Sequence, residues 1–188
     1  LKIVLKVLAD VGLIGFPNVG KSSILASISM AKPKIANYAF TTIHPNLGVV
    51  LISDYEKFVV ADLPGLIVGA SKGAGLGIQF LKHISRTKLL LHVIDVSKNQ
   101  LDQIMKDVDI IAKELKDYDK ELSQKDKWYV FNKVDLLNEE NLEKLKIHVA
   151  DKIKVKTYFT SALDKFGLDE LCEDIIEYLR DEISNEKI

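Results

Sequence analysis

VGLIGFPNVGKSS, residues 11–23, places an apolar run, a glycine-bounded loop and the start of a helix in direct succession. Residues 15–22 of this stretch match the pattern G-x-x-x-x-G-K-[ST] without a mismatch. Glycines allow the loop backbone to turn its N–H groups toward one point, where the N-terminus of the following helix adds a positive partial charge. Because strand, loop and helix follow one another in this order, the stretch predicts a phosphate-binding loop in an α/β fold.

The side chains of this loop have separate predicted roles. Lys21 is expected to reach the β- and γ-phosphates of a nucleotide, and the Ser22 hydroxyl is expected to hold Mg²⁺. The loop residues predicted to bind the nucleotide are Gly15, Pro17, Asn18, Val19, Gly20, Lys21, Ser22 and Ser23. The loop alone permits ATP or GTP, so the choice of base must be decided elsewhere in the chain.

Strand-like and helix-like patterns alternate along the remaining sequence. Apolar runs predict strands at 11–15, 46–53, 57–62, 88–95, 127–131 and 153–160. Helical periodicity predicts helices at 22–30, 101–118, 139–150 and 168–182, with one more ending near residue 86. The short connection at 54–56 fits an antiparallel hairpin, whereas strands separated by helices favour parallel pairing. The prediction is a three-layer α/β P-loop NTPase fold with a six-stranded, mostly parallel sheet and one antiparallel edge strand.

The composition is that of an ordinary globular protein, with 47% hydrophobic and 28% charged residues in 188 positions. The net charge of −1 argues against wholesale coating of nucleic acid, and the single cysteine, Cys172, excludes an internal disulfide and favours a reducing compartment. Because no apolar run approaches the ~18 residues that span a membrane, we expect a cytoplasmic protein, and we also expect a monomer. Residues 1–8 are interpreted as a linker left from a preceding domain, and residues 9–188 as the nucleotide-binding domain.

A second motif, Asp62-Leu63-Pro64-Gly65, stands at the end of the apolar strand predicted at 57–62. An acidic residue in this place can reach Mg²⁺ through water, and the Gly65 N–H can meet a γ-phosphate. Residues 64–77 also hold five of the ten glycines of the chain. This composition favours a segment that orders with a nucleoside triphosphate and relaxes with the diphosphate.

A third motif, Asn132-Lys133-Val134-Asp135, decides the base. The Asp135 carboxylate can accept hydrogen bonds from guanine N1–H and the 2-amino group, and adenine lacks that pair of donors. A site built in this way discriminates by ~10⁴ or more, because the wrong base leaves a buried carboxylate unpaired. The Lys133 stem can cover the ring face. Ser161-Ala162-Leu163 follows the next predicted strand, where the Ala162 N–H can meet guanine O6.

The order GFPNVGKS, FTT, DLPG, NKVD, SAL resembles that of the translation-factor-class regulatory GTPases, and the segments around the first three motifs resemble the GTPase domain of the Obg proteins. The resemblance extends from about residue 9 to residue 178. It implies a Ras-like G domain that binds GTP, GDP and Mg²⁺. It also implies a role in assembly of the large ribosomal subunit, contact with its RNA, and a link to guanosine tetraphosphate.

The resemblance assigns a loop at 37–45 that senses the γ-phosphate. Phe40, Thr41 and Thr42 are predicted to approach the nucleotide there, with Thr42 the preferred Mg²⁺ ligand and Thr41 the alternative. The predicted Mg²⁺ ligands are therefore Ser22, Thr42 and Asp62. The alternative role for either threonine is a loop hydroxyl that bonds its own backbone.

The means of hydrolysis is less usual. Many GTPases place a water-orienting glutamine directly after the D-x-x-G glycine, but this chain has Leu66 there, which can neither donate nor accept a hydrogen bond. Gln79 and the only two arginines, Arg86 and Arg180, are interpreted as helix-surface residues. The resemblance implies that Asn18 can hold K⁺ where other GTPases use an arginine, and the alternative is that Asn18 only bonds the loop backbone. The predicted catalytic residues are Asn18, Lys21, Thr42 and Gly65.

Two other functions stay open. Leu66 favours a nucleotide-sensing, ribosome-binding module in which hydrolysis is incidental, and an ATP-using P-loop enzyme is opposed by residues 132–135. The basic side chains that flank the loops at 37–45 and 64–77 could contact ribosomal RNA phosphates, which we keep as a hypothesis. The alternative is that they form a solvated helix face. These side chains are Lys32, Lys34, Lys72, Lys82, His83 and Arg86.

Overall fold

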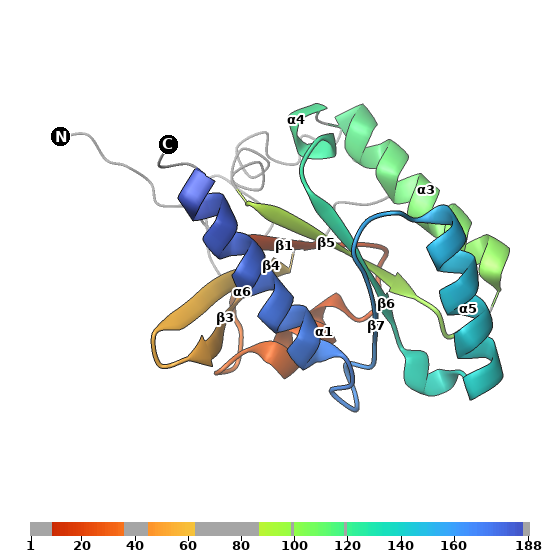
Figure 1. The fold of residues 1–188 in the computed structure, drawn as a ribbon, viewed down its shortest axis with the longest axis horizontal. Coiled ribbons are helices and arrows are strands. Elements are labelled where there is room, and N and C mark those ends of the chain that lie inside the picture. The colour runs from red at the N-terminus through yellow and green to blue at the C-terminus, as the bar shows by residue number, and fades with distance from the viewer. Residues whose placement is uncertain (1–8, 36–44, 63–86, 99, 119, 186–188) are drawn as a thin grey trace.

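A seven-stranded sheet runs through the centre of the computed structural model (Figure 1). The structure describes residues 9–35, 45–62, 87–98, 100–118 and 120–185. The strands are β1 (Val11–Ile14), β2 (Lys34–Ile35), β3 (Asn46–Ser53), β4 (Glu56–Asp62), β5 (Leu89–Asp95), β6 (Lys127–Asn132) and β7 (Thr157–Thr160). The helices are α1 (Lys21–Ile28), α3 (Leu101–Tyr118), α4 (Lys120–Ser123), α5 (Glu139–Lys152) and α6 (Leu168–Asn185), with a 3₁₀ turn, η2 (Val134–Leu136).

The strand order is β2-β3-β4-β1-β5-β6-β7, and pairing is parallel from β4 through β7. The hairpin of β3 and β4 is antiparallel, as the short connection at 54–56 predicts. These features confirm the predicted α/β fold. The sheet has seven strands rather than six, because the two-residue β2 pairs antiparallel with β3 and covers the edge that β3 was expected to form.

Backbone hydrogen bonds explain where two predicted boundaries differ. Helix α1 ends at Ile28 rather than near residue 30, because Ser29 is extended and the Met30 N–H donates to the Val49 carbonyl of β3. Strand β7 begins at residue 157 rather than 153, since the Ile153 N–H still donates to Val149 at the end of α5. Both boundaries depend on which partner the backbone finds.

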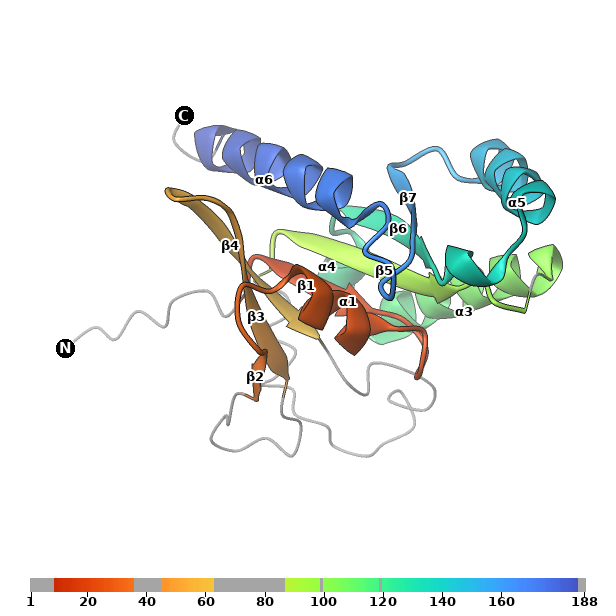
Figure 2. The ribbon, with the colours of Figure 1, turned by 90° about the horizontal axis from the view of Figure 1, so that it is seen from below.

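The helices cover the sheet on both faces, which gives three layers (Figure 2). Helices α1 and α6 share one core cluster with β1, in which Ile24, Leu25 and Ile175 are fully buried. The opposite face carries α3 and α5, whose side chains Ile104 and Leu145 pack in a separate cluster. In the part of the chain that the structure describes, no helix combines the length and the apolar character needed to cross a membrane.

Parallel strands bring their carboxyl ends to one edge of the sheet. The register pairs Leu13 with Asp62, Asp95 with Asn132, and Asn132 with Thr160, so polar side chains from four strands meet beside the loop that follows β1. Ligands of open α/β sheets bind at this edge. The fold therefore places the first and third sequence motifs side by side.

His92 on β5 is a buried polar residue on the sheet, 1% exposed and tilted against the Tyr129 ring. Among the described residues its Nδ1 atom has no hydrogen-bond partner. Burial is the main cause that lowers the pKa of His92 from 6.5 to about 3, and the charges of Lys127 and Lys21 lower it further. The folded protein therefore holds a neutral imidazole over a pH range in which the unfolded chain is protonated.

We expect this histidine to make the protein acid-sensitive. Below pH 6.5 His92 binds a proton in the unfolded state but stays neutral in the folded state, so the free energy of unfolding falls as pH drops. The slope approaches about 1.4 kcal/mol per pH unit for one such group. Urea unfolding of the wild type and of His92→Gln between pH 7 and 4.5 measures it. The variant should show a flatter profile, and equal slopes would contradict the prediction.

Candidate nucleotide-binding site

The loop between β1 and α1 has a backbone that needs its glycines. Gly15 has φ +142° and a Cβ there would lie 2.3 Å from the Val93 carbonyl oxygen. Gly20 has φ +101°, and a Cβ there would lie 2.2 Å from Asn132 Nδ2. Asn18 takes φ +64°, a conformation that asparagine tolerates better than most residues. The loop is thus pressed against β5 and β6, which agrees with a close approach of backbone to ligand.

Lys21 is buried at the start of α1, 9% exposed. Its Nζ donates to the carbonyl oxygens of Gly15 and Phe16, both at 2.9 Å. Burial lowers the pKa of Lys21, while the charge of Asp62 acts in the opposite direction. An ammonium has three donors, and these carbonyls take two of them, which leaves one for a phosphate oxygen. The loop therefore holds the lysine in place before any anion arrives.

The predicted magnesium ligands Ser22 and Asp62 lie in direct contact. The Ser22 hydroxyl donates to Asp62 Oδ2 at 2.5 Å, and Asp62 is 3% exposed. Among the described residues the other carboxylate oxygen, Oδ1, is buried without a hydrogen-bond partner. Hydroxyl and carboxylate oxygens suit Mg²⁺, which usually takes one or two protein ligands besides phosphate and water. The described residues contain no group of three or more His, Cys, Asp or Glu that could hold a metal.

Asn132 at the end of β6 connects three segments of the site. Its Nδ2 donates to the Val19 carbonyl of the loop at 2.9 Å. Its Oδ1 accepts from the Thr160 hydroxyl at 3.2 Å and from the Ala162 N–H at 3.1 Å. Asn132 is 1% exposed, so these bonds are protected from water. The Ala162 N–H, which we expect to meet guanine O6, is engaged by Asn132 in this structure, and the contact with O6 stays a prediction.

Lys133 reaches from β6 back to the phosphate loop. Its backbone is left-handed, with φ +72°. Its Nζ donates to the Asn18 carbonyl at 2.8 Å and forms an ion pair with Asp95 Oδ2 at 2.6 Å. Sequence reasoning missed Asp95. The available signal was its place, because it ends the buried strand β5 at the same sheet edge as Asp62 and Asn132.

A pocket of about 530 Å³ lies between α1, η2 and the loop after β7. A volume of this size is typical of small-ligand sites. Seven predicted nucleotide-binding residues line it: Gly20, Ser23, Asn132, Lys133, Asp135, Ala162 and Leu163. Three more lining residues were not predicted: Ala26, Ser27 and Leu136. Ser27 lies one helical turn beyond Ser23, so the helical period could have indicated it.

The loop after β7 is held by its own polar groups. The Ser161 N–H donates to the Phe166 carbonyl, and the Ser161 hydroxyl accepts from the Asp164 N–H at 3.1 Å. The Ser27 hydroxyl of α1 donates to the Ala162 carbonyl at 2.8 Å. Ser161 is 1% exposed and shapes the turn, while the 82%-exposed Leu163 stands at the mouth of the pocket.

Several predicted residues lie outside the described residues: Phe40, Thr41, Thr42, Gly65, Leu66, Gln79 and Arg86. Arg180 is described, and its guanidinium bonds the Glu56 carboxylate at the start of β4. Asp62 ends the same strand, so Glu56 lies roughly 20 Å from it at about 3.3 Å per residue. Arg180 is therefore too far from the phosphate loop to act on a bound phosphate. This position agrees with its interpretation as a helix-surface residue.

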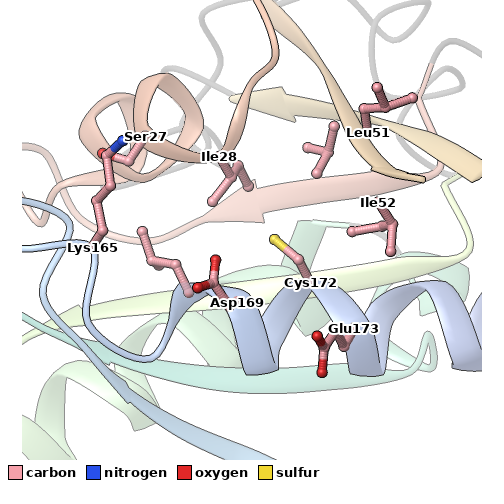
Figure 3. Close-up of a pocket in the computed structure, with 10 residues that line it drawn as sticks. Ser27, Ile28, Leu51, Ile52, Lys165, Asp169, Cys172 and Glu173 are labelled. Atoms are coloured by element: carbon pink, nitrogen blue, oxygen red, sulfur yellow. The ribbon is translucent and has the colours of Figure 1, made fainter. Parts of the chain in front are cut away.

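A second, smaller pocket of about 230 Å³ lies behind the loop after β7, between α1, β3 and α6 (Figure 3). It shares Ser27 with the first pocket. Cys172 lines it and belongs to the main core cluster, on the buried face of α6. Burial, with Asp169 and Glu173 nearby, raises the pKa of Cys172 to about 12. This thiol is a core residue and no nucleophile.

Comparisons with known proteins agree with this geometry. A family model described as 50S ribosome-binding GTPase matches residues 10–133. The G domain of the Thermotoga maritima FeoB iron transporter has a TM-score of 0.65 at 22% identity, and the match covers 90% of this chain and 97% of that one. An Era variant from Aquifex aeolicus bound to GDP and AlF₄⁻ has a TM-score of 0.65 at 25% identity, covering 90% of this chain and 56% of that one.

A third structure, a variant of Streptococcus thermophilus NFeoB bound to GDP, has a TM-score of 0.62 at 22% identity, and the match covers 87% of this chain and 58% of that one. This chain thus spans nearly all of an isolated FeoB G domain but less than two thirds of the Era and NFeoB chains. At 22% identity the two FeoB neighbours show the fold.

The family model extends from the residue before β1 to Lys133, and so includes the phosphate loop, Asp62, Asp95 and Asn132. The described part of that stretch holds the buried lysine, the hydroxyl–carboxylate pair and part of the lining of the 530 Å³ pocket. The chain is a GTPase domain, and it belongs to the family of 50S ribosome-binding GTPases.

Proposed function

We propose that this chain is the G domain of an Obg-type GTPase that acts in assembly of the large ribosomal subunit. It binds GTP and GDP, with guanosine tetraphosphate as a further guanine ligand, and works as a monomer in the cytoplasm. The observation that carries the nucleotide part is the buried Asn132 side chain, which bonds the phosphate loop and the base-side loop together. The description of the matching family supports the ribosomal partner.

In this proposal each described residue of the loop has one task. Lys21 binds the β- and γ-phosphates with the donor that its loop carbonyls leave over. Ser22 and Asp62, together with Thr42, would hold Mg²⁺, which when bound offsets the negative charge of the phosphates. Asp135 and the Lys133 stem bind the base from the exposed side of the pocket.

Cleavage is proposed to be slow and to depend on K⁺. Leu66 cannot orient water, and Arg180 is held by Glu56 away from the site. Asn18 is exposed, and its backbone carbonyl is held by the Lys133 ammonium at 2.8 Å. An amide oxygen is a suitable ligand for a hard cation, with phosphate oxygens as further ligands. This arrangement supports Asn18 as the residue that holds K⁺ beside the phosphates.

The test is GTP hydrolysis with the cation and purified ribosomal subunits as variables. We expect turnover in KCl to exceed turnover in NaCl at equal ionic strength by about tenfold or more, since a fixed charge at the phosphates stabilises the transition state. Asn18→Gly should lose this difference while it keeps GDP binding. Glycine allows the φ of +64° without strain, so this variant removes only the amide.

The large subunit should raise the rate of single-turnover cleavage, and the small subunit serves as the matched control. Equal rates in the two salts, or stimulation that survives in Asn18→Gly, would contradict the potassium site. Subunit binding that depends on the nucleotide, with cleavage unchanged, would instead support the alternative favoured by Leu66: a nucleotide-sensing, ribosome-binding module in which hydrolysis is incidental.

A further inference from the structure

The Lys133 ammonium is clamped between two elements that flank the base pocket. One acceptor is the Asn18 carbonyl of the phosphate loop at 2.8 Å, and the other is the Asp95 carboxylate at 2.6 Å. The stem between the left-handed backbone and this double anchor lines the pocket of about 530 Å³. The two acceptors of the ammonium therefore determine where the Lys133 stem lies along the pocket.

Asp95 is itself held firmly. It is the last residue of β5 and pairs in register with Asn132 of β6. Its Oδ1 accepts from the Ser97 N–H at 2.8 Å, so that both carboxylate oxygens are engaged. Partial burial would raise the pKa of Asp95, but the hydrogen bonds from Lys133 and Ser97 outweigh it and keep the pKa below the usual range. The carboxylate is thus charged and fixed in orientation at neutral pH.

We infer that Asp95 is a positioning residue for the base: by holding Lys133 along the pocket wall, it sets how long a guanine nucleotide stays bound. A free lysine side chain loses up to about 2 kcal/mol of rotamer entropy when it is immobilised. Asp95 fixes the Lys133 side chain before the nucleotide arrives, so nucleotide binding does not have to supply this entropy cost. The inference rests on the proposed nucleotide binding, and it extends that binding to a residue outside the recognised motifs.

The same contact connects the two halves of the site. Lys133 bonds the carbonyl of Asn18, the loop residue with φ +64°, while Asn132 bonds the neighbouring Val19 carbonyl. Asp95 neutralises the Lys133 ammonium, which donates the hydrogen bond to the Asn18 carbonyl. Loss of Asp95 should therefore loosen the base wall without removing any group that touches phosphate or Mg²⁺.

The experiment is release of a fluorescent N-methylanthraniloyl GDP, followed by stopped flow after mixing with excess GDP. We expect Asp95→Asn to release the nucleotide roughly tenfold faster, because the ion pair with Lys133 is replaced by a weaker hydrogen bond from the ammonium to an uncharged amide oxygen. Lys133→Met should release it at least as fast. In the Lys133→Met background, Asp95→Asn should change the rate less than twofold, since the partner is already gone.

Asp174→Asn is the matched control. Asp174 also accepts from a lysine, Lys156, with its side chain 32% exposed against 25% for Asp95, but it lies on α6 away from the pocket. This variant should leave the release rate unchanged. The effect of Asp95→Asn should be the same in Mg²⁺ and in EDTA, because Lys133 covers the base side.

Four outcomes separate the possibilities. An unchanged release rate in Asp95→Asn, or effects of Asp95→Asn and Lys133→Met that simply add, would overturn the role of Asp95. Equal acceleration in Asp174→Asn would show a loss of stability alone and would also overturn it. Failure of the wild type to bind the fluorescent GDP would instead overturn the proposed nucleotide binding itself.

Discussion

Asp135→Asn is expected to weaken GDP binding by about a thousandfold and to make xanthosine diphosphate the better ligand. The Asp135 carboxylate lines the pocket, and in the proposed function it accepts from two guanine donors, each bond being charge-assisted and contributing about 1.5–3 kcal/mol. Asparagine presents an N–H₂ group that repels the guanine 2-amino group but donates to the 2-oxo group of xanthine. The hydrogen-bonding pattern of base and side chain is thereby matched again.

The fold should not suffer, because Asp135 is exposed and η2 is anchored by the buried Val134. Competition of GDP, xanthosine diphosphate and ADP against a fluorescent diphosphate measures the three affinities in both proteins. Asp169→Asn is a suitable control, since Asp169 lines the second pocket behind the loop and should alter none of them. Tight binding of ADP by the wild type would show that the chain is an ATP-using enzyme and that the role given to Asp135 is wrong.

Lys21→Met is expected to reduce GTP cleavage by a factor of a thousand or more and to weaken triphosphate binding at least a hundredfold. The Lys21 ammonium is buried and held by the carbonyls of Gly15 and Phe16, with one donor left for the phosphates. Methionine keeps the length of the stem and loses the charge that stabilises the transferring phosphoryl group. Single-turnover cleavage with radiolabelled GTP measures the loss.

The two variants should fail in different ways. Lys21→Met weakens guanine and xanthine nucleotides by the same factor, because the lysine touches no base, whereas Asp135→Asn inverts the preference. Removal of the buried charge saves its desolvation cost, which offsets the loss of the bonds to the Gly15 and Phe16 carbonyls, so we expect little change in stability. Thermal unfolding without nucleotide checks this. A large drop in melting temperature would mean that the lysine acts on the loop fold rather than on phosphate.

Local motifs account for what sequence reasoning predicted well. Residues 15–22 and 132–135 carry their chemistry within a few positions, and each follows an apolar strand, so a linear pattern is enough to find them. The predicted alternation of strands and helices agrees with β1, β3 to β7, α1, α3, α5 and α6. The short β2 went unpredicted, because two residues hold no pattern and depend on the edge of β3 for their pairing.

Long-range contacts explain why the sequence did not indicate Asp95 and Ser27 as site residues. Asp95 becomes part of the site only because β5 and β6 are neighbours in register, which brings it to Lys133, 38 residues away in sequence. Ser27 is a pocket residue because its hydroxyl bonds Ala162, 135 residues away. Neither residue belongs to a motif that its own neighbours in sequence would reveal.

The sequence by itself determined the ligand class, because phosphate binding and base choice depend on residue types at fixed short spacings. Glycines at 15 and 20, Lys21 and Asp135 are needed wherever this loop and this base occur. Only the tertiary structure decided how tightly those groups are held. The Asp95–Lys133 pair, the Asn132 bonds to two loops and the carbonyls around Lys21 all require strands to be packed in one register. The Asn132 bonds and the Lys21 bond to the Gly15 carbonyl are buried, so the packed sheet excludes water from them, and no pattern along the chain specifies that exclusion.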